Sequence, residues 1–356
     1  MTTRSSDDER WMAAAIEESR KGFPAPNPNV GCVVVRDGAV IGRGHHEEAG
    51  CAHAEAVALE QAGPNARGST LYATLEPCNH HGRTPPCTQA ILASGVQRVV
   101  IAAPDPNPIA QGGAERLRAE GVEVAEGVLR EEAEQANPVY SFRFRTGRPF
   151  VLLKMGVTLD GLIADSRGAN RWITGEQARH RAHELRAKMG CVLVGARTAE
   201  WDNPQLTVRA FPKRHQPLRV IVAPHSHLRP TLTLFTDSSA PTVWFSPPDA
   251  KPPGPHVSAV SLPEEDGKVA PAAILSELAS RGVIGVLVEG GAVTAAQFLD
   301  AGLVDEIELH VAPKVLGRGT PWLQGSGLQL DEAIQVEWIE TRAIGEDLLV
   351  RARVVN

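Results

Sequence analysis

The chain has 356 residues, a formal net charge of −6 and an aromatic content of 4 %. This length predicts roughly two domains, each large enough to bury a hydrophobic core. The acidic balance and the scarcity of aromatic side chains disfavour a nucleic-acid-binding surface, because such surfaces carry basic fields and stack bases on aromatic rings.

The cysteines and the apolar runs indicate a compartment. Five cysteines, an odd number, are spread thinly along the chain. The first residues, MTTRSSDDERWMAAA, have no basic region followed by an apolar core, and no later apolar run is long enough to span a bilayer. We therefore expect a cytoplasmic protein without a membrane partner, whose reduced thiols are free to bind metal.

The first part of the chain alternates between helical and strand-like patterns. Helices are predicted over 7–20, 52–63 and 85–95, and strands over 68–77 and 96–108, with two further strands in 31–44 around the turn 36–39 and a helix, a short strand and a helix in 116–140. This alternation predicts an α/β domain with a mostly parallel or mixed sheet between helices.

A second α/β domain is predicted to begin near residues 140–148, where the pattern of helical and strand-like segments changes. The segment 142–164 opens a new strand, and apolar runs that read as strands between helices follow at 191–196, 218–223, 241–246 and 282–291. We expect domains over 1–144 and 145–356, with the proline-rich segment 246–267 forming a loop within the second domain.

The strongest motif is a set of metal-binding residue types in the first domain. CAHAEAVA places His53 two residues before Glu55, and TLEPCNHHGRTPPC places Cys78 and Cys87 directly after prolines. In zinc deaminases a His-x-Glu segment and a later Pro-Cys pair supply one His and two Cys to the metal, while the Glu moves protons. Here eight residues, 79–86, separate the two cysteines, and we expect them to form a polar loop over the metal.

The pattern predicts hydrolytic deamination. A zinc ion with three protein ligands keeps a fourth position for water, whose pKa falls to about 7. Glu55 can take the proton of that water and pass it to a ring nitrogen and to the departing ammonia. We expect His53 and Glu55 in the first turn of one helix and Cys87 at the start of the next, where the helix dipole favours a thiolate.

Plainer interpretations apply to the remaining candidates. Cys32 and Cys191 lie in strand-like apolar runs and are expected in the core, and Cys51 is expected to be structural. A closed structural zinc site would need a fourth ligand, which His80 or His81 could supply, and this alternative stays open.

One segment of the second domain has the shape of a phosphate anchor. An apolar strand runs into Glu289-Gly290-Gly291, and a helical pattern follows whose free N–H groups could accept a phosphate. The motif is weak alone, because Gly-Gly is a common tight connection between a strand and a helix. No G-x-G-x-x-G fingerprint follows a strand in this half, which argues against a Rossmann domain.

These motifs together resemble the RibD family of riboflavin-biosynthesis enzymes, in which a zinc pyrimidine deaminase is fused to an NADPH-dependent reductase. The resemblance is carried by PNPNVGCVVV, HAE and TLEPCNHHGRTPPC in the first half, and by LLKMGVTLDGLIA, RWITG, VGARTAEWDNPQLTVR, LVEGG and LVDEIELHVAPKVLG in the second. It implies a cytidine-deaminase-like α/β/α domain followed by a dihydrofolate-reductase-like α/β domain.

The resemblance also implies the reactions. The first domain would remove the 2-amino group of 2,5-diamino-6-(5-phosphoribosylamino)pyrimidin-4(3H)-one with one zinc ion. The second would use NADPH to reduce the ribosyl group of the product, giving 5-amino-6-(5-phosphoribitylamino)uracil. Such enzymes form homodimers or homotetramers through the reductase domain, so a homo-oligomer that acts on a small phosphorylated pyrimidine is expected.

Site residues follow from the same resemblance. In the deaminase it implies zinc ligands His53, Cys78 and Cys87, a proton shuttle Glu55, and substrate contacts Asn27, His46, His80 and Arg83. In the reductase it implies cofactor contacts Thr174, Gly195, Thr198, Glu289, Gly290 and Gly291. Substrate or catalytic contacts would be Lys154, Asn170, Arg186, Asp202, Asn203, Leu206, Arg209 and Glu289.

Some details stay open at this level. Hydride would reach C1′ of the ribosylamine in its ring-opened imine form, and either Asp202 or Lys154 would manage the proton. The strictness for NADPH over NADH is not readable. Three residues depart from the usual pattern of the family, namely Asn79 and Asn170, where serine is expected, and Trp201, where a smaller residue is common.

Three rival interpretations remain. A tRNA adenosine deaminase with an accessory domain is disfavoured by the acidic balance, the few aromatics and the long loop between the cysteines. A zinc-bearing scaffold with a nucleotide-binding regulatory domain is disfavoured by Glu55, since a structural site needs no proton shuttle. An enzyme with one decayed half is disfavoured because the motifs of both halves are present.

Overall fold

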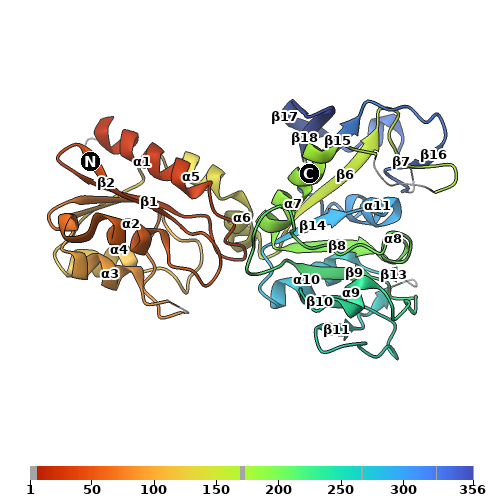
Figure 1. The fold of residues 1–356 in the computed structure, drawn as a ribbon, viewed down its shortest axis with the longest axis horizontal. Helices are drawn as coiled ribbons and strands as arrows, with labels where there is room; N and C mark the ends of the chain where they lie inside the picture. The colour runs from red at the N-terminus through yellow and green to blue at the C-terminus, as the bar shows by residue number, and fades with distance from the viewer. Residues whose placement is uncertain (1–5, 83, 169–172, 266–267, 326, 356) are drawn as a thin grey trace. The chain divides into compact units, whose positions relative to one another are not determined.

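The computed structural model describes residues 6–82, 84–168, 173–265, 268–325 and 327–355. The chain divides into two compact units, Met1–Gly147 and Arg148–Asn356 (Figure 1). In the described parts of the chain, no helix combines the length and the apolar character needed to span a membrane.

The N-terminal unit is built on a mixed five-stranded sheet. Its strands lie in the order β2-β1-β3-β4-β5, with bounds β1 Gly31–Arg36, β2 Ala39–His45, β3 Thr70–Leu75, β4 Arg98–Ala103 and β5 Glu123–Glu126. Strand β1 runs antiparallel to β2 and β3, whereas β3, β4 and β5 are parallel. The central strands are almost continuously apolar because helices cover both faces of the sheet.

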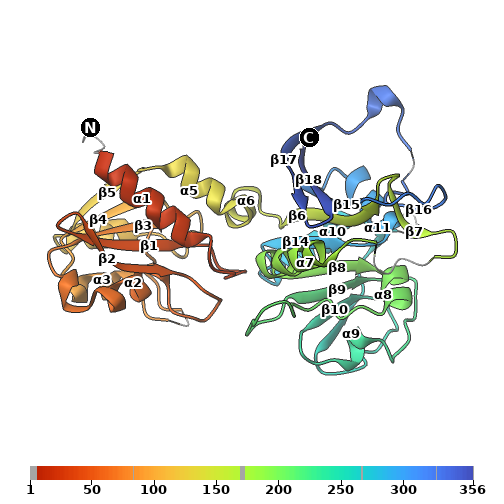
Figure 2. The ribbon, with the colours of Figure 1, turned by 45° about the horizontal axis from the view of Figure 1, so that its top comes forward.

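Helices form the outer layers of this unit. Their bounds are α1 Ser6–Ser19, α2 Ala54–Ala62, α3 Cys87–Ser94, α4 Gly113–Ala119, α5 Arg130–Ala136 and α6 Pro138–Thr146, with a short 3-10 turn at Gly63–Ala66. Figure 2 shows α1 and α5 on one face of the sheet and α2 and α3 on the other. The unit is therefore a three-layer α/β/α sandwich, as predicted.

The strand predicted to open in segment 142–164 begins later than expected. Residues up to Thr146 belong to helix α6, and strand β6 starts at Phe150. Pro138 stands at the first turn of α6, where its missing N–H costs nothing, and Gly147 ends the helix with a φ of 78°. Proline and glycine thus fix a short helix in a segment whose phenylalanines resemble a strand.

The C-terminal unit contains a nine-stranded sheet in the order β11-β10-β9-β8-β14-β6-β15-β18-β17. The strand bounds are β6 Phe150–Thr158, β8 Cys191–Gly195, β9 Leu218–Val222, β10 Thr242–Phe245, β11 Val257–Val260, β14 Gly285–Glu289, β15 Glu306–Ala312, β17 Val336–Ile344 and β18 Asp347–Val354. Strands β11 to β15 of this order are parallel, and β18 and β17 add an antiparallel edge.

Five helices and several small elements complete this unit within the described residues. They are α7 Glu176–Met189, α8 Ala196–Asp202, α9 Thr233–Thr236, α10 Pro271–Ser280 and α11 Ala292–Asp300, a 3-10 turn at Leu330–Glu332, and two small antiparallel pairs formed by β7 Leu162–Asp165 with β16 Gly319–Pro321 and by β12 Glu264–Glu265 with β13 Lys268–Val269. The apolar clusters of this unit include one around Leu153, Leu193 and Val286, one around Ile221 and Trp244, and a small one of Ala178, Ile344 and Leu349.

The loop predicted over 246–267 is partly wrong. Residues Val257–Val260 form strand β11, which pairs in parallel with β10. Val257 packs into the apolar cluster around Ile221, and Ala259 lies against it. Burial of these two side chains explains why a strand forms between proline-rich flanks.

Candidate functional sites

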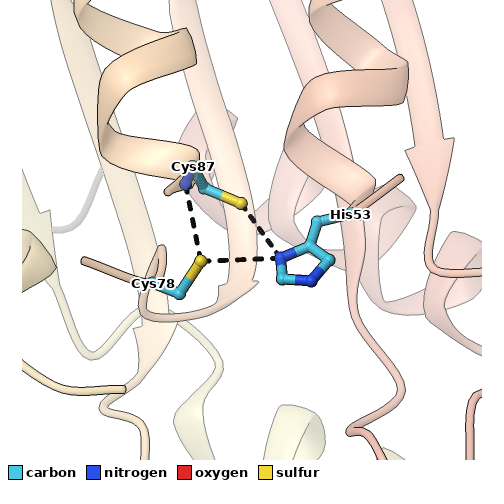
Figure 3. Close-up of side chains that lie close together, drawn as sticks. All are labelled: His53, Cys78 and Cys87. Carbon is cyan, nitrogen blue, oxygen red and sulfur yellow. Dashed lines mark hydrogen bonds between the residues drawn. The ribbon is translucent and has the colours of Figure 1, made fainter. Parts of the chain in front are cut away.

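The first site lies at the N-terminal ends of helices α2 and α3. His53 immediately precedes α2 in an extended conformation, and Cys87 is the first residue of α3. Cys78 lies in the segment that leaves β3, so three local structures direct their side chains to one point (Figure 3). Both cysteines are buried.

The three side chains fit a tetrahedral metal ion. Nδ1 of His53 lies 3.2 Å from Sγ of Cys87 and 3.5 Å from Sγ of Cys78, and all three ligand atoms lie within 4.8 Å of one another. Zinc bonds of about 2.0–2.1 Å to nitrogen and about 2.3 Å to sulfur place tetrahedral ligands about 3.5 Å apart. Among the residues that the structure describes, neither His80 nor His81 joins this cluster, so the geometry favours an open site over a closed one.

Charge around the cluster suits a metal thiolate and a proton carrier. Hydrogen bonds from Cys87 and His53 lower the pKa of the Cys78 thiol to about 4, although burial opposes them, and the backbone N–H of Cys87 also donates to this sulfur at 3.4 Å. Glu55 lies in the first turn of α2 and is only 3 % exposed. Burial raises the pKa of Glu55, as a group that must both accept and release a proton requires.

Two of the predicted substrate residues are joined beside the cluster. Nδ2 of Asn27 lies 3.0 Å from Nε2 of His46, and Nδ1 of His46 lies 3.1 Å from the carbonyl oxygen of Ala52. Burial lowers the pKa of His46 to about 4, so its ring is neutral at pH 7, donates to Ala52 and accepts from Asn27. The rings of His46 and His53 meet edge to face with centroids 5.0 Å apart.

Part of the loop between the two cysteines lies beside the cluster of His53, Cys78 and Cys87, close to where the sequence predicted it. The hydroxyl oxygen of Thr84 is 3.3 Å from Nε2 of His53, a contact that the sequence motif did not single out. Nδ1 of His80 is buried and has no hydrogen-bond partner in the described part of the chain. Arg83, predicted to contact the substrate, lies outside the described residues.

Glu76 is a further residue that the sequence did not reveal. Its carboxylate accepts backbone N–H groups from Gly112 at 3.1 Å, Ala114 at 3.0 Å and Asp105 at 3.4 Å. It therefore ties the segment after β4 to the end of β3, two residues before Cys78. A carboxylate directly after an apolar strand was the available signal, but its partners are distant in sequence.

The second site is a cavity of about 650 Å³ in the C-terminal unit, bounded by β6, β8, β14, α8 and α11. Ten of the predicted reductase residues line it, namely Lys154, Thr174, Arg186, Gly195, Thr198, Asp202, Leu206, Glu289, Gly290 and Gly291. Trp201 lines the cavity as well, and the guanidinium carbon of Arg197 lies 4.7 Å from its ring centroid. Arg197 was not predicted.

Buried charges meet at one end of the cavity. Arg186 donates to both oxygens of Glu289, at 2.8 and 2.7 Å, and to the carbonyl oxygen of Thr207 at 3.0 Å. Lys154 is the register partner of Glu289 on the neighbouring strand. Burial lowers the pKa of Lys154 while Glu289 opposes this effect, and Arg186 and Lys154 lower the pKa of Glu289 against the effect of burial.

Glycines shape the part of the cavity next to α11. Gly290 and Gly291 have φ angles of 85° and 88°, which residues with a Cβ rarely adopt. A Cβ at Gly195 would lie 2.4 Å from Oγ1 of Thr294, a buried threonine of α11 that was not predicted. This bare backbone and the free N–H groups at the start of α11 suit a cofactor phosphate.

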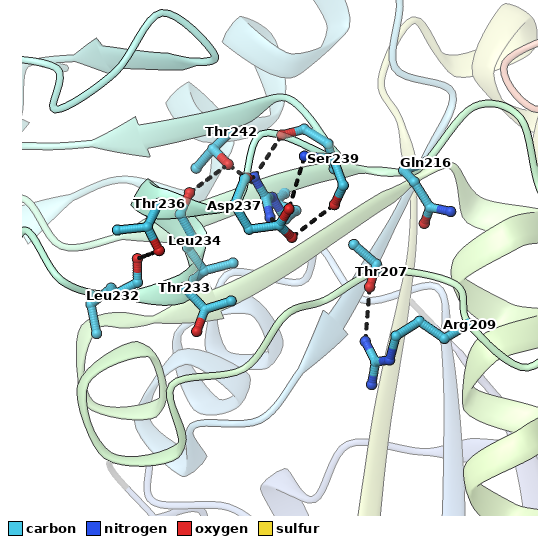
Figure 4. A network of polar contacts seen from close by, with 12 residues as sticks. Thr207, Arg209, Gln216, Leu232, Thr233, Leu234, Thr236, Asp237, Ser239 and Thr242 are labelled. Carbon is cyan, nitrogen blue, oxygen red and sulfur yellow. Dashed lines mark hydrogen bonds and ion pairs between the residues drawn. The ribbon is translucent and has the colours of Figure 1, made fainter.

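Two of the predicted residues, Asn203 and Arg209, do not line the cavity and form hydrogen bonds with other residues of the chain. Oδ1 of Asn203 accepts the backbone N–H of Thr233 at 2.7 Å. Nη1 of Arg209 donates to Oγ1 of Thr207 at 2.8 Å. Figure 4 shows this hydrogen bond and a separate network of hydrogen bonds around Asp237. Asn170 lies outside the described residues.

The fold and the two sites define a class of protein. The N-terminal unit has the α/β/α sandwich and the His-Cys-Cys ligand set of a zinc-dependent deaminase domain. The C-terminal unit has a cavity at the ends of parallel strands that could accept a phosphate group. Residues 5–103 match the family described as "Cytidine and deoxycytidylate deaminase zinc-binding region", and residues 149–350 match "RibD C-terminal domain". The chain belongs to the RibD family.

Full-length relatives support this assignment. The chain is 40 % identical to "Riboflavin biosynthesis protein RibD" of Aquifex aeolicus, over 95 % of this chain and 96 % of that protein, and 38 % identical to the protein of the same name from Escherichia coli K12, over 96 % and 98 %. A solved structure from Thermotoga maritima, named as a diaminohydroxyphosphoribosylaminopyrimidine deaminase/5-amino-6-(5-phosphoribosylamino)uracil reductase, is 38 % identical with a TM-score of 0.86, covering 98 % of this chain and 99 % of that one.

The family and the fold confirm several predictions. The chain is a bifunctional enzyme of riboflavin biosynthesis, with a zinc-dependent deaminase domain and an NADPH-dependent reductase domain. The predicted fold class, a cytidine-deaminase-like domain followed by a dihydrofolate-reductase-like domain, is also confirmed.

Proposed function

We propose that this chain acts on the substrates named for its Thermotoga relative. The domain predicted over 1–144 hydrolyses the 2-amino group of 2,5-diamino-6-(5-phosphoribosylamino)pyrimidin-4(3H)-one, consuming water and releasing ammonia. The domain predicted over 145–356 then reduces the ribosyl group of the product to give 5-amino-6-(5-phosphoribitylamino)uracil.

In the deaminase, His53, Cys78 and Cys87 hold zinc. The bound ion supplies Lewis-acid chemistry that lowers the pKa of a water molecule to about 7. Glu55 accepts a proton from the attacking water and delivers protons to the ring nitrogen and the leaving amino group. Its burial supports this role, because bulk water cannot compete for the proton it carries.

The remaining deaminase residues orient the substrate. Asn27 and His46 hold each other and present fixed polar atoms beside His53. His80 offers a buried ring nitrogen without a partner among the described residues, which a polar atom of the substrate would satisfy. Arg83 supplies a cation for the substrate phosphate.

In the reductase, NADPH supplies the hydride for C1′ of the ring-opened imine. The proposed cofactor contacts that line the cavity are called the cofactor wall and comprise Thr174, Gly195, Thr198, Gly290 and Gly291, with Glu289 at its end. Lys154 and Asp202 also line the cavity and are the groups that can manage the proton. The other residues proposed to contact the substrate are Arg186, Leu206, Asn203, Arg209 and Asn170. Arg186 contributes through its ion pair with Glu289.

The observation that carries the proposal is the open three-ligand cluster with buried Glu55 beside it. The test is a coupled assay of the zinc-loaded protein on the diaminopyrimidine substrate, with and without NADPH. Ammonia release without NADPH, followed by NADPH oxidation that requires deamination, is expected. Glu55→Gln should lose ammonia release yet reduce the deaminated compound, whereas Glu60→Gln, an exposed change on the same helix, should retain both activities.

Each negative result of this assay would contradict a different part of the proposal. Ammonia release without NADPH oxidation would confine the proposal to the first domain. No ammonia release from zinc-loaded wild-type protein would contradict the proposed substrate, because the ligands and the proton shuttle would then serve another molecule.

We also infer a homo-oligomer that acts in the cytoplasm. Strand β17 is the outer strand of the large sheet and pairs with β18 on one side. Val336, Trp338 and Ile339 on it are exposed, Trp338 by 72 %. An exposed apolar edge strand is a ready surface for a second copy of the chain. The thiols of the proposed zinc ligands stay reduced in the cytoplasm.

A further inference from the structure

Charged residues cross the large sheet at one level beside the cavity. The pairing registers align Glu289 of β14 with Lys154 of β6, and Lys154 with Glu308 of β15. Residues aligned in this way on neighbouring strands direct their side chains to the same face of the sheet. Lys154 therefore stands between two carboxylates, of which Glu289 was expected from the sequence and Glu308 was not.

Helix α7 supplies one arginine to each carboxylate. Arg186 binds Glu289, and one and a half turns earlier Arg181 donates to both oxygens of Glu308, at 3.0 Å each. Oε1 of Glu308 also lies 2.9 Å from Nε2 of His310. The side chains of Glu308 and His310 have no exposed surface.

Glu308 is thus a fixed negative charge. Burial alone would raise its pKa, but hydrogen bonds from His310 and Arg181 lower the pKa to about 2. A carboxylate held by three hydrogen bonds has little freedom to turn away from its neighbours. Lys154, whose pKa is lowered by burial, gains from Glu308 a second anionic neighbour that favours its charged form.

We propose that Glu308, held by Arg181 and His310, is a positioning residue of the reductase that orients the Lys154 ammonium group and keeps it charged. This inference rests on the proposed role of Lys154 in the reductase. A buried ion pair is weak evidence for stability, because desolvation offsets the attraction. A role in orienting Lys154 accounts for the position of this pair on the level of the lysine.

Other charged groups also face these two side chains. Lys154 is influenced by Glu289 and Arg186 as well as by Glu308 and Asp347. The groups around Glu308, taken from α7, β15 and β18, are Arg181, Glu184, Lys188, His310 and Arg351. The first variant to test therefore changes Glu308 alone and leaves these groups in place.

The first measurement is an NMR titration of protein labelled at the side-chain carbon and nitrogen of lysine. The chain has seven lysines, and loss of one signal in Lys154→Arg assigns Lys154. In Glu308→Gln, which keeps the shape of the side chain, the titration of Lys154 should move to lower pH by about one unit. The control is Glu306→Gln, two residues earlier on the same strand, which removes the ion pair with Arg351. It should leave Lys154 unchanged.

A Lys154 titration that is identical in wild type and Glu308→Gln would overturn the inference. If Glu308→Gln fails to fold, the double variant Glu308→Leu/Arg181→Leu, which removes the buried pair together, replaces it with the same expected direction. Because the titration needs neither NADPH nor substrate, it decides the role of Glu308 even if the reductase assay fails.

The second measurement is the pH profile of reduction of the deaminated substrate. Glu308→Gln should move the alkaline limb of kcat to lower pH and leave the KM for NADPH unchanged. A uniform loss of kcat at every pH, together with an unchanged Lys154 titration, would indicate a structural role and would contradict the inference. Wild-type protein that does not oxidise NADPH would contradict the proposed function instead.

Discussion

The hydroxyl oxygen of Thr84 lies 3.3 Å from Nε2 of His53, across the imidazole ring from Nδ1, which faces the two thiols. A hydrogen bond at Nε2 fixes the tautomer whose Nδ1 lone pair is free for a metal, and it also holds the plane of the ring. Thr84 of the loop between the cysteines therefore supports the proposed metal ligand His53.

Thr84→Val should weaken zinc binding about tenfold or more, because it removes the oxygen that holds the His53 ring while keeping the shape of the side chain. Competition with a chromophoric chelator measures the change. Thr84→Ser, which retains the hydroxyl, is the matched control and should bind zinc like the wild type. Equal affinities for the valine and serine variants would mean that Thr84 contributes nothing to the ligand.

The candidate zinc ligands could be predicted from the sequence because short motifs mark each of them, although His53 and Cys87 are 34 residues apart. His53 and Cys87 stand at the starts of helices, and helix starts are marked by short-range patterns. The strand-to-helix turn at Glu289, Gly290 and Gly291, which lines the cavity, could also be recognised in the sequence.

What the sequence missed depends on contacts between distant segments. Glu308 lies opposite Lys154 only because β15 pairs with β6, an order that no local pattern encodes. The hydrogen bond from Arg209 to Thr207 was likewise not predicted, since the path of its loop is set by tertiary packing. Helix α6 was missed because its aromatic residues resemble a strand, whereas Pro138 decides the local structure.

The stability of the deaminase unit should depend on the protonation of Asp105. Burial raises the pKa of this carboxyl to about 6, although the backbone N–H of Asn107 and the hydroxyl of Tyr140 donate to it at 2.8 and 3.0 Å. The value for the unperturbed group is 3.8, so the folded state binds more protons than the unfolded state between these pH values. The free energy of unfolding should therefore fall as the pH rises from about 4 to about 6.

Asp105→Asn removes the charge and keeps an oxygen for both donors. It should flatten this pH dependence and raise the free energy of unfolding at pH 7 by about 1–3 kcal/mol. Hydrogen exchange of the β4 amides in the full chain, followed at pH 5 and pH 7, measures the change. Parallel pH dependences for variant and wild type would show that Asp105 titrates normally in the folded protein.

Gly195→Ala should disturb the cofactor wall. The new Cβ would lie 2.4 Å from Oγ1 of Thr294 and push α11 away from the cavity, at a cost of about 1–3 kcal/mol in stability. The dissociation constant for NADPH should rise, as measured by fluorescence titration. The double variant Gly195→Ala/Thr294→Ala removes the clash and should recover the thermal stability. A single variant as stable as the wild type would exclude this contact as a constraint.

Trp338→Asp should convert the proposed oligomer into monomers. Trp338 is 72 % exposed on β17, the outer strand of the large sheet, and a charge on an edge strand opposes pairing with another copy. Light scattering coupled to size-exclusion chromatography gives the mass in solution. Ile109→Asp is the control, because Ile109 is 74 % exposed in the N-terminal unit and its replacement should leave the mass unchanged. An oligomer that survives Trp338→Asp intact would place the interface away from β17.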